Sequence, residues 1–91
     1  MMRPRTVWEI DVPMKHRQDD SRTGVHVFTG LADNASEAVA SAVRACEIAR
    51  LHAMSSRPIP AGTSRVDWSA RGLRPDWELC WDRAQKKQIV L

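Results

Sequence analysis

The chain has 91 residues, of which 43% are hydrophobic and 27% are charged, and its formal net charge is +3. This allows one domain with a single core, and no apolar run approaches the about 20 residues of a membrane-spanning helix. The N-terminus lacks the continuous apolar region of a signal peptide, and two cysteines, Cys46 and Cys80, exclude a disulfide framework. We therefore expect a single domain over residues 1–91, without a membrane partner, in the reducing cytoplasm.

The N-terminal segment is predicted to be a strand that follows a flexible basic arm, residues 1–5. Residues 6–14 alternate between apolar and polar side chains, which is typical of a half-buried strand. The apolar residues on its inner side are Trp8, Ile10 and Val12. Pro13 has no backbone N–H to donate, so it is expected to mark the end of this strand or an edge position.

A second strand is predicted over residues 24–31, after a polar connection. Its alternation places Val25 and Val27 on the inner side and His26 and Phe28 on the outer side. The two strands most simply form an antiparallel hairpin with a long charged loop.

Residues 34–54 are predicted to form an amphipathic helix. Asn34 is a favourable N-cap, and Glu37 completes a capping box three residues later. The face directed to the core consists mostly of alanine, so bulky side chains are expected opposite. Two apolar residues, Ile48 and Leu51, fall among the polar positions instead.

Two further strands are predicted over residues 66–71 and 77–82, joined by a turn that contains glycine and proline. The tail, residues 83–91, is expected to be frayed or to form a short edge strand. The four tryptophans alternate onto the face that meets the alanine-lined helix: Trp8, Trp68, Trp77 and Trp81. The order β-β-α-β-β predicts an α+β fold, a four-stranded, mainly antiparallel sheet with one helix packed on one face.

No catalytic or metal-binding constellation is evident. Five carboxylates share the predicted outer face of the sheet: Glu9, Asp11, Asp67, Glu78 and Asp82. Such a cluster can hold Mg²⁺, but its spacing is not diagnostic, and a solvated face that is acidic to discourage sheet stacking is the preferred explanation. The histidines and cysteines lack the paired spacings of zinc sites, and no phosphate-binding glycine loop is present. We therefore expect a protein that is not an enzyme and has no metal or cofactor.

The first functional hypothesis is a protein-interaction module. Ile48 and Leu51, with Arg44 nearby, form a small stripe on the helix outside its core face. This stripe, or a free sheet edge, is expected to contact a partner protein or a second copy. A two-fold homodimer is the simplest form of such a contact.

The alternative hypothesis is an accessory nucleic-acid-binding protein. Exposed aromatic residues are too few for base stacking on the sheet, so binding would depend on basic side chains that contact phosphates. These candidates lie in the arm, the first loop and the second turn: Arg3, Arg5, Lys15, Arg17, Arg22, Arg71 and Arg74. This hypothesis requires the basic segments to converge on one surface, whereas the first requires an exposed apolar patch.

Overall fold

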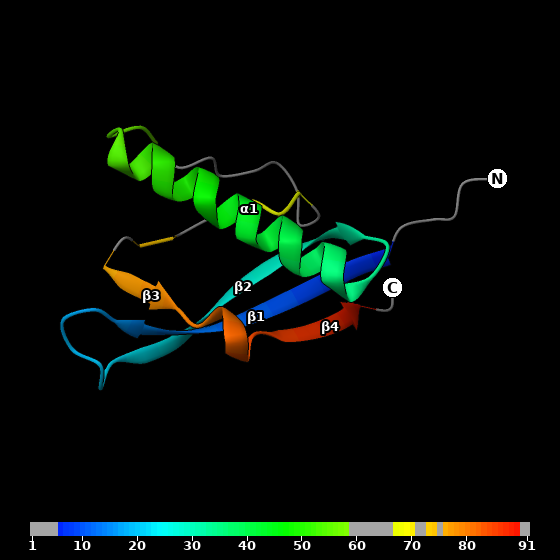
Figure 1. Cartoon of the computed structure of the whole chain (residues 1–91), viewed down its shortest axis with the longest axis horizontal. Helices are drawn as coiled ribbons and strands as arrows, with labels where there is room; N and C mark the ends of the chain where they lie inside the picture. Colours follow the sequence, from blue (N-terminus) through cyan, green and yellow to red (C-terminus); the bar gives the residue numbers. More distant parts are fainter. Residues whose placement is uncertain (1–5, 59–66, 71–72, 75, 90–91) are drawn as a thin grey trace.

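A computed structural model describes residues 6–58, 67–70, 73–74 and 76–89. It consists of an antiparallel sheet with one helix on one face, so the predicted α+β fold and the order β-β-α-β-β are confirmed (Figure 1). The elements are β1 (Thr6–His16), β2 (Thr23–Ala32), α1 (Ala35–Met54), β3 (Trp77–Leu79), the 3₁₀ helix η1 (Trp81–Arg83) and β4 (Gln85–Ile89). The predicted arm lies outside the described residues.

Strand β1 is the centre of the sheet. It pairs with β2 along almost its whole length, from Thr6 opposite Ala32 to Lys15 opposite Thr23. Its other side is divided between two short strands, because β3 pairs with residues 14–16 and β4 pairs with residues 7–11. The sheet therefore has two edges, β2 on one side and β3 with β4 on the other.

Pro13 explains why the second edge is divided. The proline lies inside β1, which continues to His16, so the expected end of the strand at Pro13 is wrong. Its carbonyl oxygen accepts a hydrogen bond from the Cys80 amide at 2.8 Å, but it has no N–H to return one. The chain leaves the sheet at this point, forms η1, and pairs again as β4. The predicted strand over residues 77–82 is thus only three residues long, and a strand follows in the tail.

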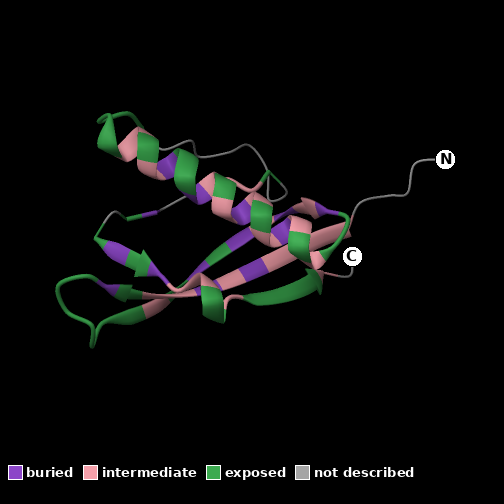
Figure 2. Ribbon diagram, viewed as in Figure 1, coloured by how far each residue is buried: buried purple, intermediate pink, exposed green. Residues whose placement is uncertain are grey.

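Helix α1 begins and packs as the sequence predicts. The Asn34 side chain accepts a hydrogen bond from the Glu37 amide at 2.9 Å, as an N-cap does. The Glu37 carboxylate accepts a hydrogen bond at 3.4 Å from the Asp33 amide, one residue before the N-cap, and not from the Asn34 amide that the predicted capping box requires. The buried residues of the helix are Ala38, Ala42, Cys46 and Ala49. Figure 2 shows buried positions on α1 and on β1 and β2 beneath it, whereas β4 is exposed along most of its length.

The inner and outer sides of β2 are opposite to the prediction. Val25 and Val27 are 56% and 50% exposed, whereas Phe28 is fully buried and His26 is nearly so. The cause is the register with β1, in which Phe28 lies opposite Ile10 and His26 lies opposite Val12. Residues opposite one another share a face of the sheet, so both join the core side chains of β1.

The predicted strand over residues 66–71 is also wrong. Within residues 67–70, the part that the structure describes, the only ladder contact is an isolated bridge between Asp67 and Gly30. Trp68 has a φ of +58°, in the left-handed region that extended strands do not use. The expected inward placement of the tryptophans holds more generally, since Trp77 is buried and Trp8, Trp68 and Trp81 pack against the core.

Candidate functional site

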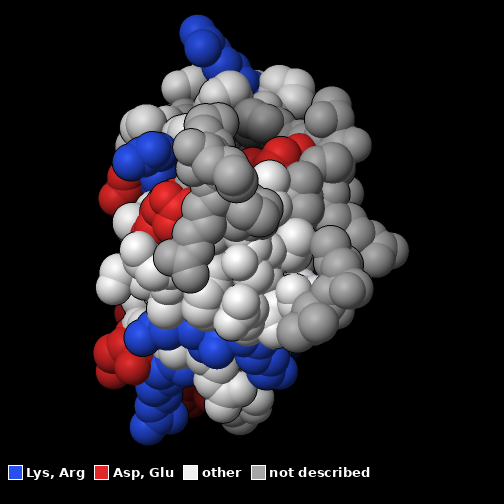
Figure 3. Space-filling view, turned by 90° about the vertical axis from the view of Figure 1, so that its right-hand side faces the viewer, with Lys and Arg blue, Asp and Glu red and all other residues white. Residues whose placement is uncertain are grey.

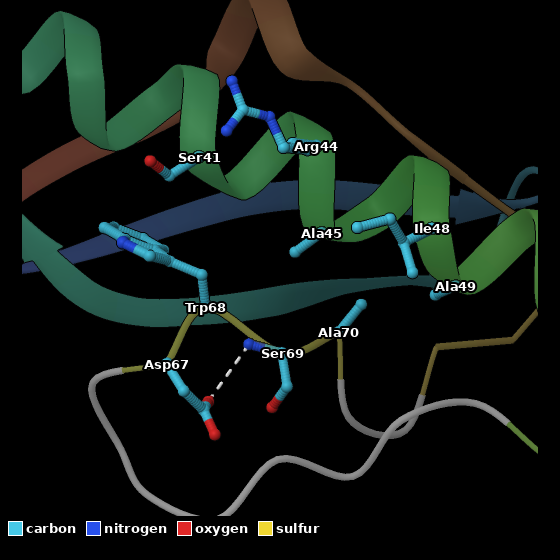
Figure 4. A pocket seen from close by; sticks show the side chains of 9 residues that line it. All are labelled: Ser41, Arg44, Ala45, Ile48, Ala49, Asp67, Trp68, Ser69 and Ala70. Carbon is cyan, nitrogen blue, oxygen red and sulfur yellow. Dashed lines mark hydrogen bonds between the residues drawn. The ribbon is translucent and has the colours of Figure 1, made fainter.

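A groove lies between α1 and residues 67–70, and we call it the α1 groove (Figure 4). Its volume is about 430 Å³, within the range of about 300–1,000 Å³ that is typical of binding pockets. Two of the three residues predicted to form an interface, Arg44 and Ile48, lie in its wall. The complete lining is Ser41, Arg44, Ala45, Ile48, Ala49, Asp67, Trp68, Ser69 and Ala70.

Trp68 forms one wall of the groove and is fixed to the edge of β2. Its backbone N–H donates to the Thr29 carbonyl at 3.0 Å, and its indole N–H donates to the Leu31 carbonyl at 3.0 Å. The ring lies directly over Gly30, where any side chain would occupy the same space as the indole. A left-handed backbone at a residue other than glycine costs about 1–3 kcal/mol, so these contacts hold Trp68 in an otherwise unfavourable conformation.

The opposite wall is formed by small side chains of α1. In Figure 4, Ala45 and Ala49 point from the helix toward residues 67–70, and Arg44 directs its guanidinium group away from them. The Asp67 carboxylate accepts a hydrogen bond from the Ser69 amide at 3.2 Å and also points away from the helix. The centre of the groove is therefore apolar, and the charged groups lie at its margins.

The apolar surface continues along α1 beyond the groove. Leu51, the third predicted interface residue, is 62% exposed, and Met54 is 83% exposed. Ile48, Leu51 and Met54 are spaced by three residues, which places each near the next on a helix surface. Met54 and Trp68 were not among the residues predicted to form an interface, although the three-residue spacing is visible in the sequence and indicates Met54.

The basic residues of the alternative hypothesis partly converge at the turn between β1 and β2. The Arg17 amide donates to the Asp76 carbonyl at 2.9 Å, and the Arg22 guanidinium group lies 5.5 Å from the centre of the Trp77 ring. These contacts bring the segment around Arg74 to the turn that carries the other cations. The converging residues are Lys15, Arg17, Arg22 and Arg74, whereas Arg3, Arg5 and Arg71 lie outside the described residues.

The same segments carry an equal number of carboxylates. They are Asp19, Asp20, Asp76 and Glu78. Asp76 also accepts a hydrogen bond from the His16 ring at 3.0 Å. The cations are therefore gathered, but their charge is balanced within the described part of this surface, and a balanced surface attracts phosphates weakly.

The predicted acidic face of the sheet is reduced to a small charge cluster. Lys87 on β4 contacts Asp11 at 3.0 Å and Glu9 at 3.8 Å. The hydrogen bond with Asp11, together with burial, raises the pKa of Glu9, and the contact with Asp11 raises the pKa of Lys87. Asp67 is not part of the sheet ladder apart from its single bridge. Among the described residues, no group of three or more His, Cys, Asp or Glu side chains is placed to hold a metal ion.

A second, smaller cavity of about 230 Å³ lies beside His26. It is lined by Met14, His26, Leu73, Arg74 and Trp77. The His26 Nε2 atom is buried without a hydrogen-bond partner in the described part of the chain. Burial lowers the pKa of His26, because the apolar surroundings disfavour the charged imidazole.

This burial predicts a loss of stability in mild acid. The unfolded chain takes up a proton on His26 near pH 6.5, whereas the folded chain resists protonation until the pH is lower. The contribution of neutral His26 to the free energy of unfolding is therefore complete above about pH 6.5, and it is lost as the pH falls toward the lower pKa of the folded state. Urea denaturation at pH 7.5 and pH 5 measures the change. His26→Leu should reduce the difference between the two conditions, and an unchanged difference would contradict the assignment to His26.

No protein-family model, curated protein or solved structure matches the chain. Within its described part, the chain has no helix that is both long enough and apolar enough to cross a membrane.

Proposed function

We propose that the protein is an interaction module that binds an amphipathic segment of a partner protein in the α1 groove. The observation that supports this most directly is a hollow with an apolar centre beside three exposed apolar side chains, Ile48, Leu51 and Met54. Exposed apolar residues are ordinary when they are single, but a row next to a preformed groove is typical of helix-in-groove recognition.

The charges around the groove favour an acidic partner. Three arginines lie between the middle of α1 and the residues just after its end, and none forms an ion pair with a described residue: Arg44, Arg50 and Arg57. The carboxylates near them are fewer, Glu47 in the same stretch of chain and Asp67 in the groove lining. Two copies that met through this surface would bring these arginines toward one another. A partner with carboxylates beside its apolar residues would be attracted instead.

Site-specific photo-crosslinking tests the proposal in the cells that produce the protein. A benzophenone amino acid at position 51 should form one discrete adduct, because the side chain there is exposed beside the groove. The matched control is position 36, also exposed but at the other end of α1, where no adduct is expected. Absence of an adduct at position 51, or equal adducts at both positions, would contradict the proposal. An adduct with the mass of two chains would show self-association at this surface instead.

Ile48→Glu should weaken binding of the cross-linked partner segment at least about 30-fold, corresponding to the about 2 kcal/mol of an interface hot spot. Arg44→Gln should have a smaller effect that disappears at high salt, because the attraction is screened. Isothermal titration calorimetry measures both. Ile48 is exposed, so its replacement should change the free energy of unfolding by no more than about 0.5 kcal/mol. Unchanged affinity in Ile48→Glu would place the binding surface elsewhere.

The nucleic-acid hypothesis has weaker support. Four of its seven basic residues lie together, but the four carboxylates in the same segments oppose their attraction for a phosphate backbone.

A further inference from the structure

The outer edge of β2 has backbone groups that point away from the sheet. The Thr29 carbonyl accepts a hydrogen bond from Trp68, so the backbone of Thr29 faces away from β1. In an antiparallel ladder the orientation repeats at every second residue. The N–H and C=O groups of Val25 and Val27 therefore also point outward. The other side of β1 agrees, because Pro13, opposite Val25, turns its carbonyl toward Cys80 and away from β2.

Only the second half of this edge is covered by described residues. Asp67 bridges to Gly30, and Trp68 bonds to the carbonyls of Thr29 and Leu31. No described residue forms a hydrogen bond with the outward groups of Val25 or Val27. Their side chains are half exposed on the face of the sheet opposite α1.

The half of this edge with which no described residue pairs also lacks the features that normally prevent edge strands from pairing. Residues 23–28 contain no charged side chain and no proline, and the register with β1 has no bulge. The opposite edge is different, because β4 has five residues and carries the exposed Lys86 and Lys87. Figure 3 views the molecule from the end at which β4 lies in Figure 1, and Lys and Arg side chains gather in its lower part. One edge is thus protected by charge, and the other is not.

We propose that the edge at residues 23–27 of β2 pairs antiparallel with the same edge of a second copy. This inference is independent of the α1 groove. A two-fold axis at Val25 would place Val25 opposite itself and Val27 of each copy opposite Thr23 of the other, and residues 23, 25 and 27 share the outward orientation that a hydrogen-bonded pair needs. The valine side chains would meet on the open face, and no charged residue of this stretch would face its own copy.

The dimer should be weak. Five residues of edge bury much less than the about 1,200–2,000 Å² of a standard interface, so association depends on concentration. Sedimentation velocity of the full chain from about 10 μM to about 1 mM should show a monomer that converts to a dimer. A chain that remains monomeric over this range would overturn the proposal.

Substitutions at position 27 identify the edge. Val27→Lys places a charge beside its own copy, and Val27→Pro removes an outward N–H that does not bond to β1, so each should weaken dimerisation at least about tenfold. Val27→Thr is the matched control, because it retains the branched side chain and the N–H, and it should still dimerise. The double variant Ile48→Glu with Leu51→Glu should dimerise like the wild type. A dimer that survives Val27→Lys, or that is lost in the helix variant, would contradict pairing through β2.

Hydrogen exchange of the unaltered protein gives a second test that requires no substitution. The amides of Val25 and Val27 should exchange more slowly as the concentration rises, because the second copy accepts hydrogen bonds from them. The amides of Gly24 and His26 bond to β1 in every state, so their exchange should not depend on concentration. Rates at Val25 and Val27 that do not depend on concentration would overturn the proposal, and would leave the α1 groove unaffected.

Discussion

Replacing Phe28 by alanine is expected to lower the free energy of unfolding by about 3–5 kcal/mol, the range for deletion of a buried aromatic side chain. Phe28 is fully buried, lies opposite Ile10 in the ladder, and stacks on Trp81 with 5.5 Å between the ring centres. Its removal would leave a cavity among residues from three elements, which cannot all move inward to fill it. Urea denaturation followed by far-UV circular dichroism measures the loss.

Val27→Ala is the control for this experiment. Val27 directly precedes Phe28 on the same strand but is half exposed, so its truncation should lower the free energy of unfolding by no more than about 1 kcal/mol. The alternation of the sequence alone predicts the opposite order, with Val27 inside and Phe28 outside. A larger effect at Val27 than at Phe28 would therefore show that β2 has the other register.

Gly30→Ala is expected to destabilise the protein by about 3 kcal/mol. A Cβ atom at position 30 would lie within the Trp68 indole, so the ring must move away. Its displacement breaks the hydrogen bonds to Thr29 and Leu31, each of which contributes about 0.5–1.5 kcal/mol to stability. Inserting an extra methyl group into a packed site costs about 1–3 kcal/mol more. Urea denaturation gives the free energy, and a red shift of tryptophan fluorescence would report exposure of the indole.

Gly24→Ala is the matched substitution on the same strand. A Cβ atom there would approach only the terminal methyl group of Met14, at 3.0 Å, and this flexible side chain can move. The effect should therefore be small. A double-mutant cycle gives a further check. Trp68→Ala should lower the free energy of unfolding less when it is introduced into the Gly30→Ala variant than into the wild type. If Gly30→Ala changes neither stability nor fluorescence, Trp68 does not lie over this glycine.

Local signals predicted the helix and the first strand, because each is determined by neighbouring residues. Asn34 and Glu37 fix the start of α1, and the alternation of Trp8, Ile10 and Val12 fixes the buried side of β1. The buried side of β2 could not be predicted from neighbouring residues in this way. Apolar residues occur at both odd-numbered and even-numbered positions of that strand, and the register with β1 determines which set is buried.

The last third of the chain was predicted less well for the same physical reason. Residues 66–71 alternate like a strand, but only an isolated bridge to β2 is present among those described. Residues 85–89 have a polar sequence, yet they form β4 because the side of β1 before Pro13 has backbone groups to pair. Tertiary pairing overrides local preference in both places.

The candidate site was only half visible in the sequence. Ile48 and Arg44 were identifiable because they lie outside the alanine face of the helix. The wall that faces them depends on hydrogen bonds between Trp68 and a strand nearly forty residues away, which no local pattern contains. The balance of charge around the basic residues was not visible in the sequence for the same reason. Asp76 and Glu78 approach the turn between β1 and β2 only in the folded chain.

Pro13 also divides the sheet into units that can open separately. Hydrogen-bonded ladders grow and fray by propagation from one pair to the next, and the missing N–H of Pro13 interrupts propagation from β3 to β4. Ile89 lies opposite Val7, so β4 closes a loop of almost the whole chain, whereas β1 and β2 join through a short turn. Strand β4 can thus detach while the hairpin and its helix stay folded. The proline gives this small domain a boundary between cooperative units within a single sheet.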